Sequence, residues 1–322
     1  VAGRVIVIDP STVGKPSACF LSKLVNIDRV LLMIPNLAIH MDRDANNGHK
    51  YNAQKDMLPL YGDLTAKNTF FQTIAEAANV TEDEILGHDL FLYNRQEPCI
   101  WGASREFLSA PRLDDLQCAF ASLKGFLSGA KEDYLALHCV FDNEEVGSGT
   151  KQGAASTFLY DVLWRMNKAL GKNEEEFYRA VAGSFMLSCD NAHAVHPNYR
   201  QKTDATNCVY MNDGIVIKSH AGQKYTSDAV SVAVFRMICE KAGVPLQYFA
   251  NRSDEAGGST LGNIAMTQVS MNTVDIGLPQ LAMHSAYETA GVKDTEYMVK
   301  AVETFYASHI QADSDGNYQI NQ

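Results

Sequence analysis

Short apolar runs separated by turn-forming residues characterise the first third of the chain. The runs are bounded by glycine, proline, asparagine or aspartate, which is typical of β-strands. They are VIVI at 5–8, VLLMI at 30–34 and LFLY at 90–93. The polar stretch 42–55 shows no period and predicts a loop, whereas Thr81 followed by three acids predicts the start of a short helix or turn. A β-rich domain is therefore expected over residues 1–107.

The pattern changes at about residue 108, where apolar runs of strand length alternate with stretches of helical period. The expected strands are Tyr134–Phe141, Ser184–Ser188 and Met271–Gly277. The expected helices are Leu116–Ser128, Ala154–Leu170, Ser227–Ala242 and Glu296–Ser308. Such alternation predicts an α/β fold with a mostly parallel sheet flanked by helices. Residues 108–322 are thus expected to form a second, larger domain that ends in a solvated tail, DSDGNYQINQ.

The charge of the chain argues against two classes of partner. Its formal net charge is −11 and its pI is near 5.3, whereas binding to nucleic acids or anionic lipids calls for a basic surface, so we expect neither partner. No apolar stretch reaches the length of a membrane span. The seven cysteines are scattered without a CxxC pair, which suits a reducing compartment, and we expect a cytoplasmic protein.

Acidic residues and one histidine follow the predicted strands of the second domain. Glu144 and Glu145 follow Tyr134–Phe141 after two further residues, and Asp190 follows the strand that contains 184–188. His284 follows the strand that ends at 277, and Asp114 precedes a helix. In open α/β sheets, sites gather beyond the carboxyl ends of strands, so we expect these side chains at one edge of the sheet.

Carboxylates with one imidazole are suitable ligands for zinc, manganese or cobalt. A pair of such ions needs a bridging carboxylate and terminal ligands, and an unligated carboxylate can then accept a proton from water. Each residue alone also has a plainer role. Asp114 and Asp190 can cap a helix or turn, His284 can be a structural histidine, and the glutamates can be a solvated strand end. Only their joint occurrence favours a metal site.

Six motifs in order give the chain a full-length resemblance to the aspartyl aminopeptidases, a family of co-catalytic zinc exopeptidases. The motifs are GRVIV at 3–7, IPNLAIHMDR at 34–43, APRLDDL at 110–116, FDNEEVGS at 141–148, SCDNAHAVHPNY at 188–199 and PQLAMHS at 279–285. The resemblance implies a zinc-exopeptidase-like fold and a metal-dependent aminopeptidase that removes N-terminal residues from peptides, with acidic residues preferred.

The resemblance also implies roles for the residues at the predicted sheet edge. Asp114 matches the carboxylate that bridges two divalent ions, most simply zinc, with manganese or cobalt as alternatives. Glu144 matches the general base that deprotonates the metal-activated water. Glu145 and His284 match terminal ligands of one ion, and Asp190 matches a terminal ligand of the other.

Further matches concern the substrate and the assembly. His40 matches a histidine that the second domain supplies to a neighbouring subunit's active site, and Lys218 matches a basic residue of the specificity pocket. Gly258 and Gly262 match a glycine-rich active-site loop. The family forms homo-oligomers built from dimers, up to a dodecamer, so domain 1–107 is expected to make dimer and substrate contacts.

The chain begins at Val1, inside a predicted strand, and we expect further residues before it in the biological protein. The family has one more ligand, in a His-Thr-Asp segment ahead of GRVIV, which does not occur here. The alternative function is therefore a non-catalytic assembly or binding subunit of the same fold. A glycoside hydrolase with paired acids ranks last, because it needs two carboxylates that face each other across a sugar.

Overall fold

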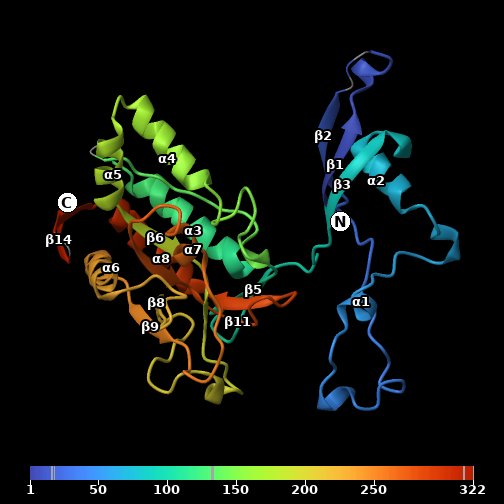
Figure 1. The fold of residues 1–322 in the computed structure, drawn as a ribbon. Coiled ribbons are helices and arrows are strands. Elements are labelled where there is room, and N and C mark those ends of the chain that lie inside the picture. Colours follow the sequence, from blue (N-terminus) through green and yellow to red (C-terminus); the bar gives the residue numbers. More distant parts are fainter. Residues whose placement is uncertain (16, 18, 132–133, 315, 322) are drawn as a thin grey trace. The chain divides into compact units, whose positions relative to one another are not determined.

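The computed structural model describes residues 1–322 except 16, 18, 132, 133, 315 and 322. It divides into two units, Val1–Arg95 and Gln96–Gln322 (Figure 1). The predicted boundary at 107 lies inside the second unit, because β4 (Cys99–Trp101) and β5 (Phe107–Ala110) extend the sheet that contains β12 (Glu288–Gly291).

The first unit is built around a three-stranded antiparallel sheet in the order β2-β1-β3. The strands are β1 (Ala2–Ile8), β2 (Phe20–Asn26) and β3 (Ile85–Phe91), and the helices are α1 (Ala53–Asp56) and α2 (Phe70–Ala78). Val5, Val7 and Val25 pack with Ile74 of α2 to form its core. The expected turn after Thr81 is present, and the Glu84 side chain accepts the N–H of Thr81.

The expected strand at 30–34 is wrong. Only an isolated antiparallel bridge joins Met33 to Leu60 there, and no described strand continues the ladder. Val30 and Met33 are exposed, so the run does not have the buried face that a strand of this composition requires.

The second unit contains a four-stranded sheet, β6-β10-β8-β9, and a five-stranded sheet, β4-β5-β12-β11-β7. The remaining strands are β6 (Phe185–Cys189), β7 (Ala192–His193), β8 (Ile215–Ser219), β9 (Leu246–Ala250), β10 (Asn272–Gly277) and β11 (Pro279–Leu281). The helices are α3 (Leu113–Gly129), α4 (Phe158–Ala169), α5 (Glu174–Ala182), α6 (Ala229–Ala242), α7 (Leu261–Ala265) and α8 (Val292–Tyr306). Helices flank the sheets as expected for an α/β fold (Figure 1).

The pairing in the four-stranded sheet is mixed. β10 runs parallel to β6, and β8 runs parallel to β9, while β10 and β8 are antiparallel. One face of this sheet packs on α3, α6 and α8 through Ile215, Ile217, Val274 and Ile276. Because side chains alternate along a strand, Val216 and Lys218 of β8 lie on the opposite face, where Val216 joins a separate cluster with Phe249.

Two expectations about the chain's second half are wrong. No strand forms at 134–141 within its described residues, because no described strand pairs with it, and Leu135 and Val140 are exposed. The tail is not a solvated coil. β13 (His309–Ser314) and β14 (Asn317–Asn321) form a hairpin, and Ile310 and Ile320 pack against the main core.

Helix α3 makes a close backbone contact with helix α8 at Gly129. A Cβ at Gly129 would lie 2.2 Å from the Glu303 carbonyl oxygen, so a methyl group there forces the backbones apart. We predict that Gly129→Ala lowers the free energy of unfolding by about 1–3 kcal/mol, as overpacking does, despite the higher helix propensity of alanine. Urea unfolding measures the change. Gly183→Ala is the control, because its Cβ meets nothing closer than 3.4 Å, and equal effects of the two changes would contradict the account.

Candidate metal centre

Asp114 is held at the point where β5 turns into helix α3. Arg112 adopts a left-handed conformation with φ 59°, and Asp114 itself is non-helical with ψ 114°, so the regular helix begins only after Asp115. The Asp114 side chain is only 4% exposed. Its Oδ1 atom and that of Asp115 are buried and lack a hydrogen-bond partner, which is the state expected of carboxylates that await a cation.

The two glutamates lie in a 3₁₀ turn at Glu144–Val146 rather than at a strand end. Asn143 begins this turn with φ 60°, and the Gly147 and Ser148 N–H groups close it by donating to the carbonyls of Glu144 and Asn143. The predicted place of the two glutamates at the end of a strand is therefore wrong. Glu145 is exposed, and Glu144 is half-buried.

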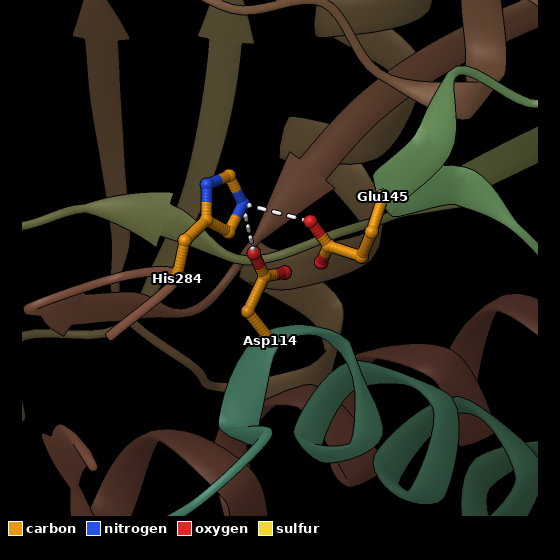
Figure 2. Close-up of side chains that lie close together, drawn as sticks. All are labelled: Asp114, Glu145 and His284. Atoms are coloured by element: carbon orange, nitrogen blue, oxygen red, sulfur yellow. Dashed lines mark ion pairs between the residues drawn. The ribbon is translucent and has the colours of Figure 1, made fainter. Parts of the chain in front are cut away.

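His284 lies in the hairpin between β11 and β12, in a left-handed conformation with φ 66°. Its Nε2 atom is 3.0 Å from Asp114 Oδ2 and 3.1 Å from Glu145 Oε2. Figure 2 shows the three side chains pointing toward one another from separate segments. Ligand atoms of Asp114, Glu145 and His284 all lie within 4.8 Å of one another, so they could hold one ion.

A second group of possible ligands shares Asp114 with the first. Oxygen atoms of Asp114, Asp115 and Asp190 also lie within 4.8 Å of one another. Asp190 follows β6 directly, and its backbone N–H donates to the Ile276 carbonyl of β10 at 3.0 Å. Asp115 was not among the residues expected in the site, although the acidic doublet Asp114–Asp115 was a signal for it.

Lys218 is the cation that compensates Asp190. Its side chain is 2% exposed, and Nζ donates to Asp190 O at 2.8 Å, Asp190 Oδ2 at 3.1 Å and Asn191 O at 3.1 Å. Burial alone would lower the pKa of Lys218, but the Asp190 and Asp275 carboxylates raise it, so the ammonium stays charged. These contacts occupy its three donors. Its predicted role in a specificity pocket stays a prediction.

The remaining predicted residues are Gly258, Gly262 and His40. Gly258 is exposed in a loop, and Gly262 is buried in α7, where a Cβ would lie 2.5 Å from Ser188 Oγ. His40 is an exposed turn residue of the first unit. Their substrate contacts stay predictions.

Burial and mutual repulsion raise the pKa values of the clustered acids. Burial, followed by the nearby Asp190 carboxylate, raises the pKa of Asp114 to about 8. Burial and Asp190 likewise raise the pKa of Asp115, and burial, Asp190 and Glu145 raise that of Glu144. A divalent cation would compensate the repulsion among these carboxylates and favour their ionised form.

The clustered carboxylates and the imidazole, with ligand atoms within 4.8 Å of one another, suit a divalent metal ion of the kind that metallohydrolases hold. The sequence model of the aminopeptidase I zinc metalloprotease (M18) family matches residues 1–306, and the chain belongs to this family. Its members act on peptide bonds, and the resemblance in the sequence is thereby confirmed.

Matches to individual proteins agree with this family assignment. The chain is 47% identical over 311 residues to a probable M18 family aminopeptidase 2 of Clostridium acetobutylicum, covering 95% of this chain and 70% of the relative. It is 39% identical over 293 residues to the Pseudomonas aeruginosa protein of the same name, covering 89% of this chain and 67% of that protein. The fold matches a chain in the cryo-EM structure of the Ape4 and Nbr1 complex, with TM-score 0.87 and 33% identity. That match covers 95% of this chain and 62% of the matched chain.

The raised pKa of Asp114 predicts a pH dependence of the metal-free protein. An unfolded aspartate titrates near pH 4, so the folded state binds the proton more tightly. This contribution to stability is present below about pH 4 and is lost as the pH rises through about 8. In the presence of chelator, the free energy of unfolding should fall over this window, and Asp114→Asn should flatten part of the fall. An unchanged slope in urea titrations at several pH values would contradict the assignment.

The buried ion pair predicts a second effect on stability. Removing one member of such a pair leaves an uncompensated buried charge, so Lys218→Met should cost about 3–5 kcal/mol of unfolding free energy. The control is Lys202→Met, whose partner Glu255 is 2.7 Å away but exposed, and which should cost less than about 1 kcal/mol. Equal losses in denaturant unfolding would show that burial gives Lys218 no special role.

Proposed function

We propose that the chain carries the catalytic centre of a metal-dependent aminopeptidase that removes N-terminal residues from peptides. The observation that carries the proposal is the sharing of Asp114 between two groups of possible ligands. One group adds Glu145 and His284, and the other adds Asp190, as the family resemblance implies, together with Asp115, to which the resemblance gives no role.

The donor set suits two divalent ions, with zinc first and manganese or cobalt as alternatives. Asp114 would bridge them, and its second oxygen, now without a hydrogen-bond partner, is available for this. When bound, such ions polarise the scissile carbonyl and make water acidic enough to attack at neutral pH.

Glu144 is proposed as the general base. It lies next to Glu145 yet belongs to neither ligand group among the described residues. Its raised pKa, caused by burial and by Asp190, brings it closer to neutral pH, where a carboxylate can accept a proton from water and return it to the leaving amine.

The substrate preference and the assembly are parts of the same proposal. Preference for an acidic N-terminal residue rests on the resemblance alone, because the Lys218 ammonium is engaged by Asp190 and Asn191. One similar structure, at 26% identity, is the dodecamer of S. cerevisiae mApe1. We propose a homo-oligomer in which His40 contributes to a neighbouring site.

The seven free cysteines support the proposed cytoplasmic location. No helix in the described part of the chain is long and apolar enough to cross a bilayer.

Glu144→Gln tests the proposal, because it removes the base and leaves every proposed ligand in place. We predict that kcat on aminoacyl substrates falls by about 10²–10⁴-fold, the usual contribution of a general base, while the zinc content of the purified protein is unchanged. Glu145→Gln is the matched control, one residue away, and should lose zinc.

A panel of chromogenic substrates with acidic, basic and apolar aminoacyl groups should show the highest kcat/KM for the acidic members. A wild-type protein that holds zinc but hydrolyses none of them would favour the non-catalytic subunit instead. A protein without zinc or activity would contradict the proposal.

A further inference from the structure

Glu288 is a buried carboxylate that contacts two ligand-bearing segments at once. It is the first residue of β12 and is 2% exposed. Its Oε1 atom accepts the backbone N–H of His284 at 2.7 Å, and its Oε2 atom accepts the backbone N–H of Asp114 at 3.0 Å. One side chain thus joins the β11–β12 hairpin to the beginning of α3.

Neither of these two segments has a regular backbone at the point of contact. His284 has a positive φ, and Asp114 departs from helical geometry, so no helix or strand ladder fixes their N–H groups. Instead, the Glu288 carboxylate fixes these two N–H groups by accepting a hydrogen bond from each.

The position of Glu288 itself is firmly fixed. β12 lies inside the five-stranded sheet, with β5 on one side and β11 on the other. Glu288 is paired with Ala110 of β5, and the next residue, Thr289, is paired with Leu281 of β11. The sheet therefore holds the backbone from which the Glu288 side chain supports the residues it contacts.

We infer that Glu288 is a positioning residue, which sets the separation of the Asp114 carboxylate and the His284 imidazole through their backbone N–H groups. The inference rests on the proposed function, in which both side chains hold a cation. Each Glu288 oxygen is occupied by an N–H donor, so Glu288 acts on the cation through Asp114 and His284. Partners of this kind typically affect metal affinity by about 10- to 100-fold.

The chain offers a matched control in Asp294. This carboxylate is 0% exposed and also accepts two backbone N–H groups, from Asn212 at 2.6 Å and Gly214 at 3.0 Å. Its donors lie in a loop that carries none of the proposed ligands. Asp294→Asn therefore removes the same kind of interaction without touching the candidate centre.

The test compares zinc binding to the full chain and to its Glu288→Gln and Asp294→Asn variants by isothermal titration calorimetry. The glutamine keeps one acceptor and turns an NH₂ group toward the second backbone donor. We expect Glu288→Gln to weaken zinc binding about 10- to 100-fold and to alter the absorption spectrum of bound Co²⁺. Asp294→Asn should lower the melting temperature and leave both readouts unchanged. Equal zinc affinities in the two variants would overturn the inference.

Amide hydrogen exchange of the metal-free proteins provides a readout that does not depend on zinc. Exchange at His284 and Asp114 should be faster in Glu288→Gln than in Asp294→Asn, and equal exchange would overturn the inference. If Glu288→Gln does not fold, Glu288→Asp replaces it, since it keeps both acceptors and withdraws them by one methylene. Wild-type protein that binds no zinc would contradict the proposed function, while the exchange rates would still decide the role of Glu288.

Discussion

Repulsion among buried carboxylates is the constraint on which the second unit depends. Asp114 lies close enough to Asp190, Glu145 and Glu288 for each of them to raise its pKa. Bringing such groups together is unfavourable unless cations or hydrogen-bond donors compensate them. In the described residues, Lys218 compensates Asp190, and two backbone N–H groups compensate Glu288. The Oδ1 atoms of Asp114 and Asp115 are buried and have no hydrogen-bond partner, so a cation bound beside them would compensate their charge.

The two faces of the four-stranded sheet have different roles: one packs the apolar core, and the other carries the charge that compensates Asp190. Alternation along β8 sends Ile215 and Ile217 into the apolar core and places Lys218 on the other face, beside Asp190. The close crossing of α3 and α8 fixes the helix at whose start Asp114 lies. The other proposed ligands lie outside regular helices and strands: Glu145 in the 3₁₀ turn 144–146, Asp190 directly after β6 and His284 between β11 and β12.

The sequence predicted the parts of the fold that have a strong period. The helices that became α3, α4, α6 and α8 and the strands that became β1, β6 and β10 were expected close to their observed bounds. The apolar runs at 30–34 and 134–141 misled us, because a strand needs a neighbour and local composition does not reveal one. The hairpin at the end of the chain was missed for the converse reason. Its polar composition concealed Ile310 and Ile320, which pack on the core.

In the candidate centre, too, the residues with a local sequence signal were predicted and those without one were not. Motifs identified Asp114, Glu145 and His284, and the structure brings them together from segments far apart in the chain. The only sequence signal for Asp115 was its place next to Asp114 in an acidic doublet. Glu288 had no local signal, because its role arises from a hairpin and a helix that meet only in the folded chain. Positioning residues of this kind are recognised by geometry rather than by spacing.

The most direct test of the account is anomalous diffraction at the zinc absorption edge from crystals of the full chain grown with zinc. The account predicts two peaks about 3.5–4 Å apart, each about 2.0–2.2 Å from an oxygen of Asp114. One peak should lie beside Glu145 and His284, and the other beside Asp190. Zinc bound elsewhere, with no peak in contact with Asp114, would contradict the account.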